Sequence, residues 1–178
     1  MSGRLWSAAS IAALAFLAAM LITGALPQQR QLVRSQAAGV LELLPEKITR
    51  VELESTGRVA AFSRNESGWA QETKGPIDPA VAEKLSMAVQ VMHTSAPVRV
   101  MASGEYRDTD LREFGLEKPD LSIALYQGPV PVLRAHFGGL TPDKYLRYMT
   151  VDGQQQLFLM SLFVGDMWAA VAASTFAR

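Results

Sequence analysis

The chain has no cysteine, only two histidines, and no excess of positive or negative charge. Without cysteine it can form no disulfide, no thiolate metal site and no cysteine nucleophile. Its 17 lysine and arginine residues are balanced by 17 aspartate and glutamate residues, so no basic field is available to collect phosphates. We therefore expect that the protein does not bind nucleic acid.

The two histidines, His93 and His136, do not have the spacing of metal ligands. His93 falls at the end of an expected helix, where an imidazole interacts favourably with the helix dipole. His136 falls beside Arg134 on the outer face of an expected strand. A structural or solvated role is expected for both histidines.

Acidic residues gather at Asp108, Asp110 and Glu113. A calcium loop needs a longer, regular set of oxygen donors with an internal glycine, and Arg107 and Arg112 lie among these acids and neutralise them. The sequence also has no glycine-rich phosphate loop, no nucleophile elbow and no zinc-protease helix. We expect no metal, no cofactor and no enzymatic activity.

One long apolar run, residues 5–26, dominates the N-terminal part of the chain. No acidic or basic residue lies between Arg4 and Arg30. As a helix the run would be about 33 Å long, enough to cross the core of a bilayer. We expect a transmembrane helix embedded in the lipid bilayer, with anchor residues Leu5, Trp6, Phe16, Leu17 and Leu21.

A cleavable secretory signal is the alternative interpretation of this run. Thr23-Gly24-Ala25 resembles a cleavage site with small residues. The apolar run is longer than the core of a usual signal, and its length favours an uncleaved anchor.

Chain lengths on the two sides of the run predict its orientation better than the charges do. Arg4 stands on one side and Arg30 and Arg34 on the other, so the positive flanks are nearly balanced. A short tail followed by a long domain inserts most simply with the tail, residues 1–4, in the cytoplasm. We expect a single-pass protein of the bacterial inner membrane with a periplasmic C-terminal domain.

The residues after the run are enough for one compact domain of about 150 residues. Residues 27–46 are expected to form a juxtamembrane linker, either a plain tether or a docking helix, and residues 47–178 the exported domain. Alternating polarity predicts strands in the first half, and Asp78 followed by Pro79 predicts a helix start. The expected elements are strands 48–54, 58–64 and 69–72, helix 79–93 and strand 98–101.

The second half predicts four more strands and a closing helix. The expected elements are strands 121–125, 132–137, 144–151 and 154–160 and helix 163–176. In the polar stretch between the halves, Gly115 and Pro119 are expected to fix Leu116 as a buried plug. The sequence therefore predicts an α+β fold of two antiparallel β-meanders, each followed by a helix.

The clearest hairpin has Asp152-Gly153 as a two-residue loop. This loop would pair Tyr148 with Leu157 and Leu146 with Leu159, which places these four side chains on a buried face. Aromatic, methionine and arginine side chains on the other face are the mixture that binding surfaces favour. The candidate partner surface comprises Tyr145, Arg147, Met149 and Phe158, with Trp168 of the closing helix. If that helix or the linker covers this face, it is instead a second core layer.

Four short motifs carry a resemblance to a known family. They are Phe114-Gly115-Leu116-Glu117-Lys118-Pro119, Gly138-Gly139, Tyr145-Leu146-Arg147-Tyr148 and Ser67-Gly68-Trp69. Over residues 48–173 the chain resembles membrane-anchored exported proteins catalogued as a domain of unknown function, the 4340 type. Some members of that family occur beside ABC-type transporters and gliding-motility machinery. The resemblance implies an anchored α+β domain and no catalytic residues.

The expected function is that of a non-catalytic accessory or scaffolding subunit of a bacterial membrane protein complex. Its partners would be the bilayer and an integral-membrane protein. The alternative is an exported ligand-capture module that serves an ABC-type transporter. Its pocket would lie between the two meanders, near the polar residues 103–118.

Overall fold

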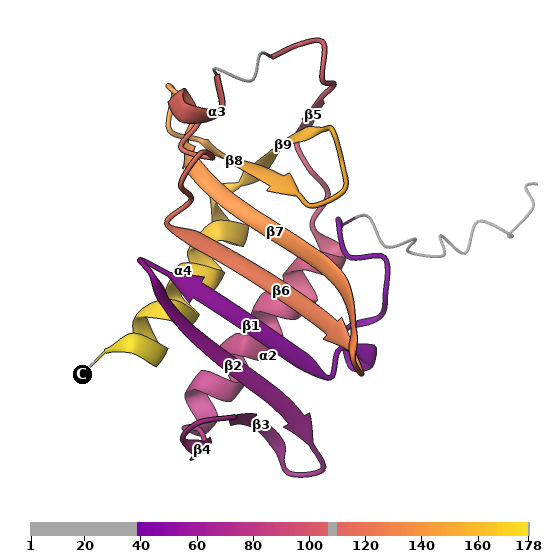
Figure 1. Ribbon diagram of the computed structural model, residues 1–178, viewed down its shortest axis with the longest axis vertical. Helices are drawn as coiled ribbons and strands as arrows, with labels where there is room; N and C mark the ends of the chain where they lie inside the picture. The colour runs from indigo at the N-terminus through magenta and orange to yellow at the C-terminus, as the bar shows by residue number, and fades with distance from the viewer. Residues whose placement is uncertain (1–38, 107–109, 178) are drawn as a thin grey trace, which may run out of the picture. The chain divides into compact units, whose positions relative to one another are not determined.

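The computed structural model describes residues 39–106 and 110–177 (Figure 1). The expected transmembrane segment, residues 5–26, lies outside the described residues. Within the part of the chain that the structure describes, no helix is both long and apolar enough to cross a membrane.

The first half of the domain is an antiparallel meander followed by a long helix. Each strand pairs with the next one along the chain. The carboxylate of Asp78 accepts a hydrogen bond from the Ala80 amide at 2.7 Å, which caps the helix as the sequence predicted. The elements are β1 (Arg50–Ser55), β2 (Arg58–Asn65), β3 (Gly68–Gln71), β4 (Gly75–Pro76) and α2 (Pro79–Thr94).

The second half repeats this order on a larger scale. A short strand and one helical turn lead into four antiparallel strands and the closing helix. The elements are β5 (Arg99–Met101), α3 (Asp110–Glu113), β6 (Leu121–Gln127), β7 (Val130–Leu140), β8 (Leu146–Val151), β9 (Leu157–Ser161) and α4 (Leu162–Phe176).

The two meanders join edge to edge because β1 pairs with β6. Within the described residues, nine strands form one antiparallel sheet in the order β4-β3-β2-β1-β6-β7-β8-β9-β5. Helices α2 and α4 lie behind this sheet in Figure 1, both on the same face. The α+β class predicted from the sequence is confirmed.

The main core lies between the sheet and the two helices. Strand residues that alternate toward the helices are buried, such as Val51, Leu53 and Phe62, and Trp168 of α4 has no exposed surface. The Trp69 indole, also buried, donates a hydrogen bond to Ser86 of α2 at 3.0 Å. The closing helix therefore packs on the sheet.

The turns determine the registers of two hairpins. Thr56 and Gly57 both have positive φ, 50° and 75°, so Ser55 pairs directly with Arg58 around a two-residue loop. The Asp152-Gly153 loop is different, because Gly153 has positive φ but Asp152 does not. The Asp152 amide instead donates to the Arg134 carbonyl at 2.9 Å and stays paired with β7.

The predicted register of the β8–β9 hairpin is therefore wrong by two residues. Tyr148 pairs with Leu159, and Leu146 with Ser161. A shift of two residues preserves the face of every side chain, because the side-chain period of a strand is two. The division of the hairpin into two faces is correct.

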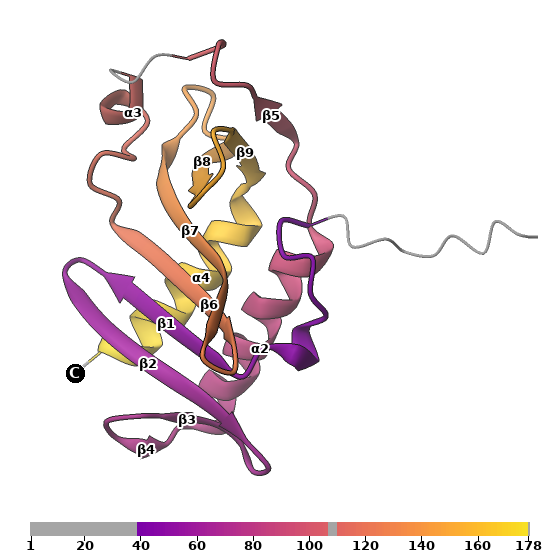
Figure 2. The ribbon, with the colours of Figure 1, turned by 45° about the vertical axis from the view of Figure 1, so that its right-hand side comes forward.

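The segment before β1 belongs to the domain rather than to a free linker. The amides of Gly39 and Leu41 each donate a 3.0 Å hydrogen bond to a carbonyl at the end of α2, and the Leu41 side chain is buried. Figure 2 shows this segment running alongside α2. Among the described residues before β1, only Pro45–Lys47 are helical, as a single 3-10 turn (η1) at the end of the expected linker. The packed domain thus begins before residue 47.

A second, smaller core covers the opposite face of β8 and β9. The predicted plug Leu116 is buried there against Leu157 and Leu159. Gly115 has φ 69°, as the sequence predicted for a left-handed exit. The Gly139 amide donates to the Phe114 carbonyl at 2.7 Å and fastens this segment to β7. Both faces of the β8–β9 hairpin are consequently buried.

Candidate functional site

The face of the sheet that points away from α2 and α4 is open over strands β2, β1, β6 and β7. Among the described residues no helix or loop crosses this part of the sheet in Figure 1. We call it the open face. Its side chains alternate with those of the main core. They include Arg50, Glu52, Glu54, Val59, Ala61, Ser122, Ala124, Tyr126, Arg134 and His136.

One half of the open face is organised by Arg50. Its Nε donates to Glu72 Oε1 at 2.6 Å, and its Nη1 donates to Glu52 Oε1 at 2.7 Å. The Tyr126 hydroxyl donates to the other oxygen of Glu52 at 2.6 Å, and the Arg50 guanidinium stacks on the Tyr126 ring. The hydrogen bond from the Tyr126 hydroxyl is the largest cause of a lowered pKa at Glu52. The hydrogen bonds to the Glu72 and Glu52 carboxylates raise the pKa of Arg50. The side chains are thereby fixed in a charged cross-strand network.

The other half is a chain of hydrogen bonds through His136. The carboxylate of Asp152 lies 3.0 Å from His136 Nε2, and the Ser122 hydroxyl lies 2.9 Å from His136 Nδ1. A carboxylate accepts, so Nε2 donates to Asp152; when the ring is neutral, Nδ1 accepts from the Ser122 hydroxyl. Arg134 Nε lies 3.8 Å from the same Asp152 carboxylate. His136 is therefore held in place rather than freely solvated.

A serine, a histidine and an aspartate connected by hydrogen bonds invite comparison with a catalytic triad. Acyl transfer also needs hydrogen-bond donors for the oxyanion, supplied in many enzymes by free backbone amides. Ser122 lies inside β6, which is paired with a strand on each side. Opposite Ser122 lie Glu54 of β1 and His136 of β7. The amides of this described stretch are used in the sheet, so they do not form an oxyanion hole at Ser122.

A concavity of about 350 Å³ lies on the open face where the two meanders join. The sequence placed a ligand pocket between the meanders near residues 103–118. The junction has such a concavity, but none of its lining residues comes from that polar segment, which packs over β8 and β9 instead. Its lining residues are Glu52, Glu54, Val59, Ser122, Ile123, Ala124, Arg134 and His136.

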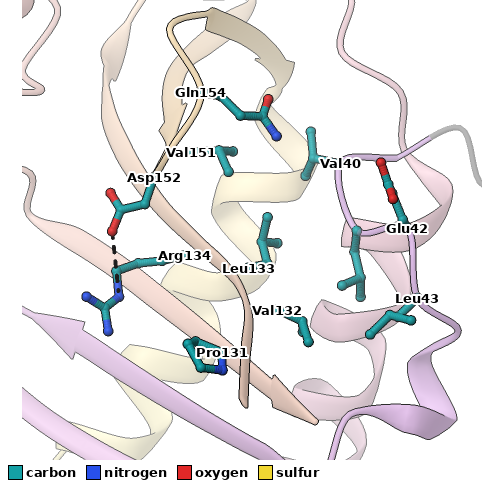
Figure 3. A pocket seen from close by; sticks show the side chains of 11 residues that line it. Val40, Glu42, Leu43, Pro131, Val132, Leu133, Arg134, Val151, Asp152 and Gln154 are labelled. Carbon is teal, nitrogen blue, oxygen red and sulfur yellow. Dashed lines mark ion pairs between the residues drawn. The ribbon is translucent and has the colours of Figure 1, made fainter.

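A larger pocket of about 500 Å³ lies at the end of the sheet where the chain enters the domain. Figure 3 shows residues of the 40–43 segment on one side, with Val132 and Leu133 of β7 and Val151 of β8 on the other. Gln154 and the Arg134–Asp152 ion pair lie at its polar rim. The pocket therefore combines apolar walls with a small number of polar groups, as small-molecule sites do.

The partner surface expected from the sequence does not exist as one exposed patch. Met149 and Trp168 have no exposed surface, and Phe158 is 5 % exposed, because α4 packs on this face of the hairpin. The second-core alternative is therefore correct for these three residues. Tyr145 remains 75 % exposed, and the Arg147 side chain lies partly buried under α4.

The remaining candidate positions are consistent with structural roles. His93 Nδ1 lies 3.0 Å from the Leu41 carbonyl and helps to hold the entering chain against α2. Asp108 lies outside the described residues, whereas Glu113 ends the short helix α3. Among the residues that the structure describes, no group of three His, Asp or Glu side chains is placed to hold a metal ion.

Sequence reasoning missed the Ser122–His136–Asp152 chain. The three residues are 14 and 16 positions apart and meet only through the pairing of β6 with β7 and β7 with β8. The Gln127-Gly128-Pro129 turn places Ser122 close to His136 in the hairpin. An irregularity in the pairing at Leu125 and Tyr126 decides the final register.

Comparisons of the chain with models of known families, with curated proteins and with solved structures found no match. The family resemblance drawn from the short motifs stays a prediction.

Proposed function

We propose that the protein is a non-catalytic, membrane-anchored accessory or scaffolding subunit of a bacterial membrane protein complex. In this proposal residues 5–26 form the anchor and the α+β domain lies in the periplasm. The domain presents its open face to a protein partner. The observation that carries the proposal is the fixed, uncovered and mostly polar surface over β2, β1, β6 and β7.

The open face has features that suit a protein contact. Arg50, Glu52 and His136 are held by cross-strand hydrogen bonds, so little side-chain freedom would be lost when a partner binds. Val59 of β2 is 66 % exposed and provides an apolar contact at the edge of this face. Arg50 and Arg134 face the carboxylates of Glu52, Glu54, Glu72 and Asp152, so the surface is net acidic and fits a basic partner patch.

The chain between the anchor and the domain limits how far the domain can move. Residues 27–38 separate the proposed anchor from Gly39, which is bonded to the end of α2. Twelve extended residues span at most about 42 Å. The domain would therefore stay within about 40 Å of the bilayer, where it can contact an integral-membrane partner.

Charge reversal on the open face tests the proposal. Glu54 is exposed and makes no ion pair among the described residues, so Glu54→Lys leaves the fold unchanged but opposes a basic partner. The matched control is Glu83→Lys on the solvent side of α2. The full chain is purified in mild detergent, and the stoichiometry of copurified membrane protein is measured. We expect Glu54→Lys to lower it and Glu83→Lys to leave it unchanged; equal stoichiometry for both would contradict the proposal.

The absence of cysteine allows a direct test of location. Glu83→Cys introduces a single exposed thiol, which a membrane-impermeant maleimide labels in intact spheroplasts only if the domain is exported. Labelling that requires cell lysis would place the domain in the cytoplasm and contradict the proposal. In addition, labelling of Ser122 by a fluorophosphonate would contradict the non-catalytic assignment.

A ligand-capture module for an ABC-type transporter is the second candidate function. The observation that favours it is the pocket of about 500 Å³ in Figure 3. Native mass spectrometry of the chain extracted from its own membrane would then detect a bound small molecule. Val40→Trp, which fills the pocket, would remove that molecule, whereas the exposed control Glu83→Lys would not. A chain that is ligand-free in every form would exclude this alternative.

A further inference from the structure

A cleft beside α4, separate from the open face, contains an arginine without a hydrogen-bond partner. The cleft has a volume of about 290 Å³ and lies between α4 and the ends of β1, β2 and β6. One wall consists of small and aromatic side chains of α4, Ala169, Ala172, Ala173 and Phe176. The remaining lining residues are Ser55, Thr56, Arg58, Asp120, Leu121 and Arg147.

Arg147 is the unusual group in this cleft. Its side chain is only 22 % exposed, and its Nε is buried without a partner. The guanidinium forms no hydrogen bond with any described residue. Its ion-pair partner, the largely exposed Asp166, lies 3.9 Å from Nη2, which is too long for a hydrogen bond. A mostly buried cation is costly unless an acceptor meets it, so Arg147 is a site where an anion would be favoured.

The position of Arg147 is fixed by the helix above it. A Cβ atom on Gly165 would lie 2.6 Å from Arg147 Cδ and 2.8 Å from Nε, so α4 lies directly on the arginine side chain at this glycine. The stem is clamped between β8 and α4. Its planar fork of donors is thereby preorganised, which lowers the entropic cost of binding a planar anion.

The second arginine of the cleft is already used within the protein. Arg58 Nη1 donates to the Phe176 carbonyl at 3.0 Å, and its guanidinium lies over the Phe176 ring. It closes the end of α4. The anion site of this cleft is therefore Arg147.

We infer that the cleft binds a small carboxylate with a short apolar body. The carboxylate would accept hydrogen bonds from Arg147, and the apolar body would lie against Ala169 and Ala173 of α4. Asp120 and Asp166 add negative charge nearby, which disfavours a doubly charged phosphate. The cleft volume of about 290 Å³ is at the small end of the range for ligand pockets, which favours a short ligand. This site does not depend on the proposed function of the open face.

Hexanoate is the probe for this inference. Binding to the full chain in a non-ionic detergent is measured by isothermal titration calorimetry, with hexan-1-ol and inorganic phosphate as comparators. We expect saturable hexanoate binding, and affinities for the alcohol and for phosphate that are lower by roughly tenfold or more. No saturable hexanoate binding, or equal binding of hexan-1-ol, would overturn the inference.

Two variants locate the site independently. Arg147→Met removes the charge but keeps an apolar stem, and Ala173→Leu narrows the cleft while leaving Arg147 in place. Each is expected to weaken hexanoate binding by roughly tenfold, whereas Ala80→Leu on the exposed side of α2 leaves it unchanged. Thermal melting checks that each variant is folded. Wild-type affinity in Ala173→Leu and in a folded Arg147→Met would refute the site.

Discussion

Truncating Met149 or Phe158 distinguishes a core position from a partner surface. Both side chains point toward α4 in the structure, Met149 with no exposed surface and Phe158 with 5 %. Each replacement by alanine leaves a cavity in a packed interior. Losses of about 2–5 kcal/mol for Met→Ala and 3–5 kcal/mol for Phe→Ala are typical of such sites.

The expected change in melting temperature follows from the size of the domain. Unfolding entropy is about 2.1 cal/mol/K per residue, so a domain of about 140 residues has roughly 0.3 kcal/mol/K. A loss of about 3 kcal/mol then lowers the melting temperature by about 10 °C. Tyr145→Ala is the matched control from the same hairpin, because that side chain is 75 % exposed, and we expect a change below about 2 °C.

The assay is thermal unfolding of the full chain in mild detergent, followed by circular dichroism. If Met149→Ala and Phe158→Ala melt within about 2 °C of the wild type, these side chains are not in the core, and the packing of α4 on this face is wrong. If Met149→Ala and Phe158→Ala lower the melting temperature and Tyr145→Ala does not, the core assignment is correct.

Three further predictions concern the open face, the capping of α2 and the second core. Tyr126→Phe removes the main cause of the lowered pKa of Glu52. The Glu52 carboxylate stabilises the fold above its unfolded pKa of about 4.3, and this stabilisation is lost as pH falls through the lower folded pKa. In urea titrations we therefore expect the variant to lose about 1 kcal/mol of unfolding free energy above pH 5, and less toward pH 3. A loss independent of pH would contradict this. Asp78→Ala removes the helix cap and is expected to cost about 1 kcal/mol in urea unfolding, with Asp78→Asn as the control that keeps the cap; equal losses for both would argue against capping. Gly138→Ala places a Cβ against the Phe114 carbonyl and is expected to destabilise the fold by about 1–3 kcal/mol. Gly139→Ala is the control, because its Cβ would meet only an ordinary 3.5 Å contact. Equal melting temperatures for the two variants would show that the segment after α3 is not fastened to β7.

Local signals in the sequence predicted local structure well. Asp78-Pro79 marks the start of α2, and Leu116, between Gly115 and Pro119, is buried as predicted. These features depend on backbone preferences of a few adjacent residues. Eight of the nine described strands follow from the same kind of pattern, whereas the two-residue strand β4 was not predicted.

The face of the β8–β9 hairpin that meets α4 was not predictable in this way. Leu157 and Leu159 on one face and Phe158 and Met160 on the other are all buried, so alternation does not tell which face receives the helices. Only the tertiary structure shows that α4 covers one face and the segment around Leu116 the other. For that reason the second-core alternative, which the sequence left open, holds at Met149, Phe158 and Trp168.

The open face was also beyond sequence reasoning. Its bonds join residues far apart, such as Glu52 with Tyr126 and Ser122 with His136, and they require strand order and register. Arg147 was recognised as notable in the sequence, but its burial under Gly165 depends on the packing of α4. Long-range neighbours of this kind arise from topology rather than from local pattern.

The most direct test of the central claim is photo-crosslinking from the open face in intact cells. A photoreactive amino acid replaces Val59, an exposed residue of that face, and in a second strain it replaces Glu83 on the solvent side of α2. The account predicts one dominant adduct with an integral-membrane protein from position 59 and no such adduct from position 83. The same adduct from both positions, or none from position 59, would contradict it.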